Sequence, residues 1–349
     1  MTIPESAATT SEATVVGIDV PSLRRYFERH VPECAGPLDI ELLHGGRSNL
    51  TYRVSDGTHR WVLRRPPLGV LTPTAHDMDR EYRVVAALGG TGVPVAGAVL
   101  SCREPDVIGA PFCVVDFVEG AVLRDGDEVV SLSATDVRGA ADALVDALVA
   151  LHGVDPAAVG LGDFGRPEGY LERQVRRWRG QWDKVATRAL PDLDALHGRL
   201  AAAVPASGAP SIVHGDYRLD NTILAPGDFG RIAAIVDWEM ATLGDPLADL
   251  GMLLMYWDPA CEPVLGARHV PTAHLAFPVG RELAERYAAR SGRDIGQLSF
   301  YQALACFKLA VIAEGIHSRY LAGRTVGTGF EHVGSAVPAL LRSGMELLP

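Results

Sequence analysis

The chain has 349 residues, of which 48% are hydrophobic and 21% charged, a composition that fits a globular protein and excludes a disordered one. Its length favours two lobes over a single core. The formal net charge is −11, and no basic face large enough to neutralise the phosphates of a nucleic acid is apparent, so we expect no nucleic-acid partner.

The five cysteines are scattered, odd in number and without a CxxC pair. This pattern argues against a disulfide framework or a structural zinc site and favours a reducing, cytoplasmic location. Residues 1–18 are polar and lack the regions of a signal peptide, so we interpret them as a disordered leader. The most apolar later stretch, 304–316, contains Lys308 and Glu314. It is too short to span a bilayer, and we expect no membrane partner.

The first third of the chain has the pattern of a small α+β lobe. Residues 21–30 carry an apolar stripe at helical spacing. Five strands follow, and an Asp-Gly turn at Asp56-Gly57 joins the second and third as a hairpin. One helix comes after the third strand. We predict the strands at 38–43, 50–54, 60–64, 96–101 and 111–117, and that helix at 76–88.

From Ser131 onward the chain is mainly helical and is interrupted by one β segment at 211–237. We therefore predict an α+β fold with two lobes. The N-lobe, 19–118, has a five-stranded antiparallel sheet and binds the nucleotide; the larger, mainly helical C-lobe, 119–349, carries catalysis and the substrate. The helices of the C-lobe are predicted at 134–152, 170–185, 191–203, 247–256, 280–290 and 298–321.

The β segment carries the groups that phosphoryl transfer needs. An apolar strand leads into His214-Gly215-Asp216, Asn221 follows the aspartate by five residues, and a second apolar strand ends at Asp237. One carboxylate has to orient the attacking hydroxyl and accept its proton, and two oxygen ligands have to hold Mg²⁺. A lone His-Gly-Asp is an ordinary turn, but the whole ordered set is hard to obtain by chance.

The spacing His-x-Asp-x-x-x-x-Asn, followed by Val-Asp-Trp, resembles the catalytic loop and the Asp-Phe-Gly segment of kinases. In these residues the chain resembles the aminoglycoside phosphotransferase and choline-kinase-like family, small-molecule kinases of the protein-kinase-like fold. The resemblance implies that Asp216, with His214, is catalytic, that Asn221 and Asp237 bind Mg²⁺, and that ATP is the donor. The run from Asp237 to Leu250 is similar to a narrower branch, the phosphotransferase domain associated with acyl-CoA dehydrogenases.

The nucleotide is expected to bind in the first lobe. Glycines in the loop between the first two strands let backbone N–H groups approach the phosphates, with an ordinary hairpin loop as the alternative. In the third strand Arg64 stands where kinases carry lysine, and either Arg64 or Arg65 takes that role. The resemblance places Glu81 of the following helix as its partner. The loop consists of Gly45, Gly46, Arg47, Ser48 and Asn49.

Residues 114–120 resemble the hinge that binds adenine through backbone hydrogen bonds, so we expect Asp116, Phe117 and Val118 at the base. A strand-end surface charge is the alternative for Asp116. The resemblance also implies that Asp249 holds the backbone of the catalytic loop.

The acceptor is a small molecule with a hydroxyl group, and two classes remain open. The arginine-rich stretch 170–179 suits phosphate or carboxylate groups. Together with the branch resemblance it favours a hydroxyacyl or hydroxyacyl-CoA acceptor. The alternative for this stretch is a surface helix with Trp178 and Trp182 packed inward. The net charge, with Glu239 and Asp245 near the motif, favours a cationic aminoglycoside or amino alcohol instead.

Other function classes fit less well. A protein kinase needs a long activation segment, and the span from Asp237 to Leu247 is short. A redox enzyme would need a dinucleotide loop, which the sequence lacks. If the chain were a catalytically inactive ATP-binding module, we would expect Asp216, Asn221 or Asp237 to be replaced, and all three are present. The only support for this alternative is Arg64, which stands in place of the usual lysine. The sequence leaves the oligomeric state open.

Overall fold

The computed structural model describes residues 15–44, 49–68, 77–325 and 329–348. The chain divides into two compact units, Met1–Tyr82 with Ala98–Phe117, and Arg83–Gly97 with Val118–Pro349. The predicted lobes, 19–118 and 119–349, remain a prediction as functional divisions.

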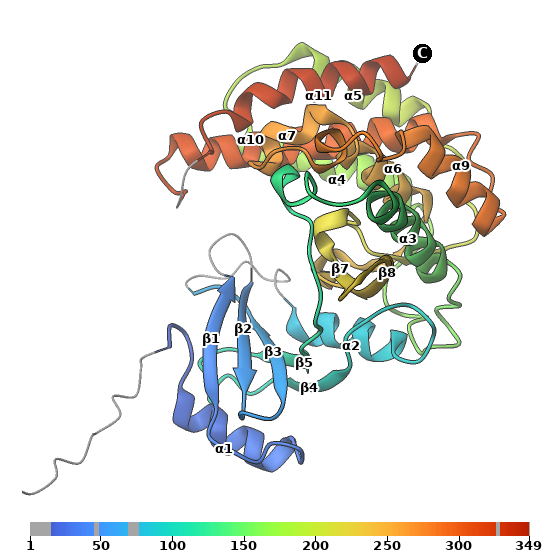
Figure 1. Cartoon of the computed structure of the whole chain (residues 1–349). Coiled ribbons are helices and arrows are strands. Elements are labelled where there is room, and N and C mark those ends of the chain that lie inside the picture. Colours follow the sequence, from blue (N-terminus) through green and yellow to red (C-terminus); the bar gives the residue numbers. More distant parts are fainter. Residues whose placement is uncertain (1–14, 45–48, 69–76, 326–328, 349) are drawn as a thin grey trace, which may run out of the picture. The chain divides into compact units, whose positions relative to one another are not determined.

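The first unit contains a five-stranded antiparallel sheet with the strand order β1-β2-β3-β5-β4 (Figure 1). This confirms the predicted sheet, and the strand bounds lie within two residues of the predicted ones. β2 and β3 form the predicted hairpin, and the Asp56 side chain accepts backbone hydrogen bonds in its turn. The strands are β1 (Asp39–His44), β2 (Leu50–Ser55), β3 (Arg60–Arg65), β4 (Ala98–Cys102) and β5 (Phe112–Asp116).

Helix α1 (Val20–His30) packs on this sheet and closes its core. Its first turn is capped by the Asp19 side chain, which accepts from the Ser22 N–H at 2.9 Å. Phe27 meets the Trp61 ring edge-on at 5.5 Å. Ile18 is buried in the same core, so the prediction of a disordered leader is wrong for 15–18; residues 1–14 lie outside the described part.

Helix α2 (Met78–Leu88) follows β3 in the chain. It begins within the predicted helix 76–88, whose first residue lies outside the described part. Within this helix, the residues up to Tyr82 belong to the first unit and those from Arg83 on belong to the second.

The second unit is mainly helical, as predicted, and α10 is its central helix. It packs against α4, α6 and α11. By length and composition α10 is apolar enough to cross a membrane, but 78% of that stretch is buried inside the protein, as expected for a core helix. The long helices are α3 (Ala134–His152), α4 (Tyr170–Val185), α5 (Pro191–Ala202), α6 (Leu247–Tyr256), α9 (Gly280–Ser291), α10 (Leu298–Leu321) and α11 (Val333–Leu347).

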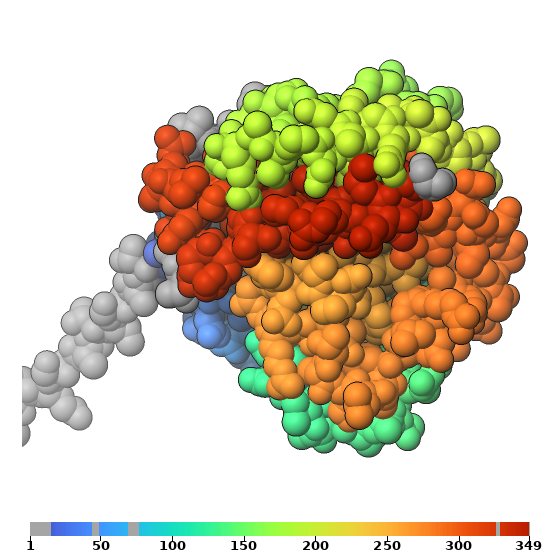
Figure 2. Space-filling view, turned by 90° about the horizontal axis from the view of Figure 1, so that it is seen from above, coloured from blue at the N-terminus to red at the C-terminus, as the bar shows by residue number. Residues whose placement is uncertain are grey.

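Helix α11 has no counterpart among the predicted helices. It lies along the surface between α5 and the segment that contains the short helix α7 (Glu262–Leu265), as Figure 2 shows. Pro338 lies inside α11, and an internal proline ordinarily ends a helix because it cannot donate a backbone hydrogen bond.

Two small antiparallel pairs of strands position the sequence motif. β6 (Ser211–Val213) pairs with β9 (Thr242–Gly244), and β7 (Thr222–Ala225) pairs with β8 (Asp228–Ile235). The β7–β8 hairpin packs on α3, as Figure 1 shows. The motif residues occupy the connections at the ends of these short strands.

Candidate active site

The predicted catalytic carboxylate lies just beyond the buried strand β6. The chain leaves β6 through His214 and Gly215 to reach Asp216. Gly215 has φ +86°, and a Cβ there would meet the Met240 carbonyl oxygen at 2.7 Å, so this turn requires glycine. The turn leaves the Asp216 side chain 25% exposed, which makes it accessible to a substrate.

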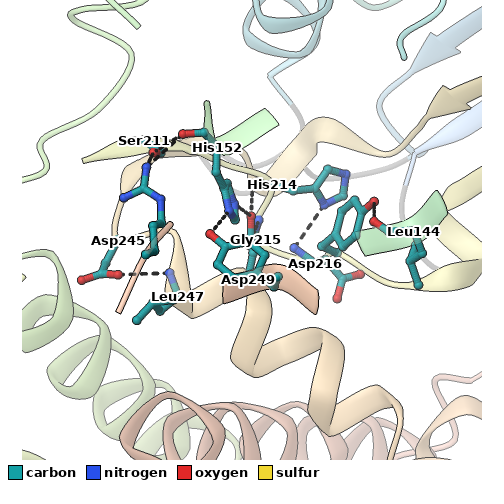
Figure 3. Close-up of polar contacts among 12 residues, drawn as sticks. Leu144, His152, Ser211, His214, Gly215, Asp216, Asp245, Leu247 and Asp249 are labelled. Atoms are coloured by element: carbon teal, nitrogen blue, oxygen red, sulfur yellow. Dashed lines mark hydrogen bonds and ion pairs between the residues drawn. The ribbon is translucent and has the colours of Figure 1, made fainter. Parts of the chain in front are cut away.

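Asp249, on α6, holds the backbone of this loop. Its carboxylate accepts the main-chain N–H groups of His214 at 2.6 Å and Gly215 at 2.8 Å, and His152 Nε2 lies 3.3 Å from it (Figure 3). Burial acts to raise the pKa of Asp249, but the His152 contact and the backbone donors outweigh burial and lower that pKa. The predicted loop-holding role of Asp249 is therefore confirmed.

The His214 ring is fully buried and bonded at both nitrogens. Its Nε2 lies 2.9 Å from the Val236 carbonyl oxygen, and the Asp216 N–H donates to its Nδ1 at 3.3 Å. A neutral ring with the proton on Nε2 satisfies both contacts. The ring also packs edge-on against Trp238 at 4.8 Å. His214 thus ties the Asp216 loop to the strand end that precedes Asp237.

Both oxygens of the Asp216 carboxylate are fixed by neighbouring groups. Tyr256 Oη donates to Oδ1 at 2.8 Å, Asn221 Nδ2 donates to Oδ2 at 3.2 Å, and Arg218 Nε lies 3.5 Å from Oδ2. Burial acts to raise the pKa of Asp216, but the charges of Arg218 and Lys308 and the Tyr256 hydrogen bond outweigh it. The pKa is lowered, so the carboxylate is ionised and able to accept a proton.

The two predicted metal ligands are tied together through the main chain. The Val236 N–H donates to the Asn221 carbonyl oxygen at 2.9 Å, and Asp237 is the next residue. The Asn221 side-chain nitrogen donates to the Asp216 main chain at 2.8 Å, which leaves the amide oxygen to face another ligand. Asp237 has φ +67° and is the one non-glycine residue in the described ranges with positive φ.

Across the described ranges no group of three or more His, Cys, Asp or Glu forms a metal cage. This is compatible with Mg²⁺, which is usually bound by one or two protein oxygens together with substrate phosphates. An amide oxygen and a carboxylate of the kind that Asn221 and Asp237 offer fit that preference.

Three residues of the site were not found by sequence reasoning. Arg218 pairs with Asp220 at 3.1 Å and lies 5.0 Å over the Tyr256 ring. Lys308, on α10, donates to the Gly215 carbonyl oxygen. The sequence could have indicated Lys308, because a lysine inside an apolar helix is buried and needs a polar partner. Tyr256 and Arg218 had none, because tyrosine and arginine occur on most protein surfaces.

A pocket of about 220 Å³ opens beside Asp216 within the second unit. Tyr256 and Arg218, which contact Asp216, form part of its wall. Most of its lining is apolar, its cations are Arg124 and Arg218, and its one carboxylate, Asp220, is paired with Arg218. The apolar residues are Leu123, Leu219, Leu253, Trp257, Leu265, Ala267, Val270 and Pro271, and His269 completes the lining.

In the first unit, Arg64 and Glu81 form the predicted pair. Arg64 Nη1 lies 2.8 Å from Glu81 Oε2, and Asn49 Nδ2 donates to Glu81 Oε1 at 2.7 Å. Arg65 points to the other face of β3, where it donates to main-chain carbonyls, including that of Ile108 at 2.9 Å. Arg64, not Arg65, therefore lies beside Glu81. The predicted loop residues Gly45, Gly46, Arg47 and Ser48 lie outside the described part of the chain.

The predicted hinge lies where the chain passes between the two units. Asp116 ends β5 with an exposed side chain. The Phe117 N–H donates to the Arg60 carbonyl oxygen at 3.0 Å. At Val118 the chain returns to the second unit. Adenine recognition by these residues stays a prediction.

The arginine-rich helix α4 packs its two tryptophans inward, since Trp178 and Trp182 are both buried. Arg173 donates to the carbonyl oxygens of Arg166 and Glu168, which precede the helix, and Arg179 pairs with Asp183. These contacts match the surface-helix interpretation for Arg173 and Arg179.

The profile of the phosphotransferase enzyme family matches residues 39–301. The chain belongs to this family. A solved structure from Ralstonia eutropha, provisionally named an aminoglycoside phosphotransferase, is 35% identical, covers 94% of this chain and 98% of that one, and gives a TM-score of 0.82. The aminoglycoside phosphotransferase APH(4)-Ia is 16% identical over 93% of this chain and 98% of that one, and shares the fold with a TM-score of 0.61. The predicted kinase-like fold and small-molecule kinase class are confirmed.

Acyl-CoA dehydrogenase family member 11 of Rattus norvegicus is 34% identical to the chain over 337 residues. The match covers 94% of this chain but 43% of that protein, so the chain spans less than half the length of this curated relative. This confirms the predicted sequence similarity to the phosphotransferase domain associated with acyl-CoA dehydrogenases.

Proposed function

We propose that the chain transfers the γ-phosphoryl group of ATP to the hydroxyl of a small molecule, with Asp216 as the catalytic carboxylate. The observation that carries this proposal is the ionised, partly exposed Asp216 carboxylate, which is fixed at both oxygens beside a pocket. APH(4)-Ia was solved with AMP-PNP, which supports ATP as the donor.

Asp216 would act on the acceptor. Its carboxylate accepts a hydrogen bond from the acceptor hydroxyl and takes the proton as the new O–P bond forms and the bond to the β-phosphate oxygen breaks. His214, buried behind the loop, would contribute by holding Asp216 in place. Little covalent work is required of the protein, so fixed geometry supplies most of the catalysis.

Asn221 and Asp237 would hold Mg²⁺ through one amide oxygen and one carboxylate. When bound, the ion neutralises charge on the phosphate oxygens. Asp237 is held next to Asn221 by the main-chain bond from Val236, so both side chains start from neighbouring points of the backbone.

We assign nucleotide binding to the first unit. Arg64 would contact a phosphate while Glu81 and Asn49 hold the guanidinium and each other in place. The loop Gly45–Ser48 would bind the phosphates through its backbone N–H groups. The hinge residues Asp116, Phe117 and Val118 would bind the adenine base.

For the acceptor we favour a hydroxyacyl group, free or as a CoA thioester. The pocket beside Asp216 has apolar walls suited to a carbon chain, and Arg124 suits a carboxylate or phosphate, whereas Arg218 is paired with Asp216 and Asp220. A cationic aminoglycoside or amino alcohol is the second candidate, because solved relatives of the fold bind hygromycin B and kanamycin. The one acidic residue in the pocket lining, Asp220, is already paired with Arg218, which counts against that candidate.

We further propose a cytoplasmic enzyme without nucleic-acid or membrane partners. All five cysteines are free, as expected in a reducing compartment. A catalytically inactive ATP-binding module is the alternative of another class.

The test is ADP release with Mg²⁺-ATP against hydroxyacyl-CoAs, hydroxy acids, aminoglycosides and amino alcohols. We expect turnover with a hydroxyacyl compound and at least a thousandfold loss in Asp216→Ala with ATP affinity unchanged, because the catalytic base is lost but no nucleotide contact. Turnover with a cationic compound alone would select the second candidate. Binding of ATP without turnover on any acceptor would favour the inactive module.

A further inference from the structure

The chemistry of the Asp216 neighbourhood points to α6 as the element that fixes the catalytic loop. Asp249 lies in the first turn of α6 and Tyr256 is its last residue. Seven residues correspond to nearly two full helical turns, about 10 Å, so both side chains leave the same face of the helix. Asp249 binds the loop through backbone N–H groups, and Tyr256 binds the Asp216 side chain itself.

Tyr256 also connects Asp216 with the pocket. Its ring lines the pocket, its hydroxyl donates to Asp216 Oδ1 at 2.8 Å, and the Arg218 guanidinium lies 5.0 Å over the ring. The opposite oxygen, Oδ2, is contacted by Asn221 and Arg218. Without the Tyr256 hydroxyl, the carboxylate would be held at one oxygen and would be free to turn about its Cβ–Cγ bond.

We propose that Tyr256 is a positioning residue, whose hydroxyl fixes the Asp216 carboxylate in the orientation that receives the acceptor hydroxyl. The inference rests on the proposed phosphotransferase reaction. Tyr256 acts through Asp216 and takes no proton from the substrate. The expected result of its loss is a slower reaction of acceptor that is already bound, with little change in how tightly the acceptor binds.

The test is Tyr256→Phe, which removes the hydroxyl and keeps the ring in the pocket wall. The free energy of one hydrogen bond to a charged group corresponds to a factor of about 10 to 100 in an equilibrium or rate constant. We therefore expect kcat to fall by about that factor. The acceptor KM should change less than about threefold, and ATP affinity should not change. An unchanged kcat, or a higher one as expected if the hydroxyl blocks the acceptor, would overturn the proposal.

Tyr301→Phe is the matched control. The Tyr301 hydroxyl donates to the Asp245 carboxylate at 2.9 Å, so the same atom is removed from the same kind of bond without touching Asp216. We expect this variant to lose stability at most and to keep its kcat. Tyr256→Ala, which also opens the pocket wall, should raise the acceptor KM in addition. A defect in Tyr256→Ala with none in Tyr256→Phe would reduce Tyr256 to a wall residue and overturn the proposal.

A second measurement does not depend on turnover. If the hydroxyl acts on Asp216, Tyr256→Phe should shift the urea midpoint of wild type but not that of Asp216→Ala, because the bond is already missing there. Additive shifts would overturn the inference. Wild type without turnover on any acceptor would instead count against the proposed function, so the two failures are distinguishable.

Discussion

At the scale of single residues, Asp237 combines a functional group with an unfavourable backbone conformation. Its positive φ costs a residue with a Cβ about 1 kcal/mol, a cost that glycine does not bear. Asp237→Gly should therefore be more stable in urea unfolding than Asp237→Ala by about 1 kcal/mol. Both variants should weaken Mg²⁺-ATP binding about tenfold or more in calorimetry, since both lose the carboxylate. Unchanged Mg²⁺-ATP affinity in both would contradict the assignment of Asp237 as a ligand.

The sequence predicted the residues of the site that form a linear motif. Asp216, Asn221 and Asp237 have a recognisable order and spacing because one loop and one strand end present them together. Tyr256 and Lys308 come from helices 40 and 92 positions beyond Asp216 in the chain, and nothing local indicates which helix face will meet the loop. Such contacts depend on packing between elements, and a single sequence does not encode them in its spacing.

At the scale of elements, α6 should be sensitive to loss of its buried charge. Asp249→Asn keeps the shape of the side chain but replaces one acceptor oxygen with an NH₂ group, which would face a backbone N–H or His152. A buried donor without an acceptor costs about 1–3 kcal/mol, so we expect unfolding free energy to fall by about that amount and kcat to fall with it. Asp245→Asn, near the start of the same helix, is the comparison, and its kcat should change less.

The presence of most helices and strands could be predicted from the sequence, because apolar periodicity is a local property. The bounds of α3, α4, α6 and α10 agree with the predicted ones. α11 was missed because Pro338 breaks the local pattern, while α5, one of the helices that α11 packs against, is distant in sequence. β9 was missed because three residues, Thr242–Gly244, are too few for a periodic signal.

At the scale of the whole molecule, stability should fall as the solution becomes acidic. Burial lowers the pKa of both His152 and His269. The unfolded chain therefore binds protons below about pH 6.5 that the folded chain does not accept. This contribution to stability is fully present above pH 6.5 and is lost progressively as the pH falls below 6.5 towards the lower pKa values of the folded state. The lowered pKa values of Asp216 and Asp249 add a further loss below about pH 4.

The check is the urea midpoint at pH 7.5, 6.5 and 5.5. Wild type should lose stability over this range, by at most about 1.4 kcal/mol per pH unit for each histidine. The double variant His152→Gln/His269→Gln should show a flatter dependence, whereas His332→Gln, at an exposed site, should follow wild type. Parallel curves for all three proteins would contradict the prediction.

Net charge and the lining of the pocket favour different classes of acceptor. The molecule carries −11, which in the sequence favoured a cationic acceptor, yet the pocket beside Asp216 is lined by two arginines and one paired aspartate. Acidic residues spread over a surface are screened by salt within about 10 Å, so the residues nearest the reacting group decide the field there.

The separation of Asp249 and Tyr256 limits how this chain can change in evolution. The two side chains meet the catalytic loop from one helix face because seven residues separate them, and one inserted or deleted residue would rotate Tyr256 about 100° away from Asp216. The number of residues between them is therefore fixed, and their kind is limited as well, because Leu250 to Met255 are buried. Length variation in this region would be tolerated only beyond Tyr256, where the chain leaves α6 and enters the wall of the pocket.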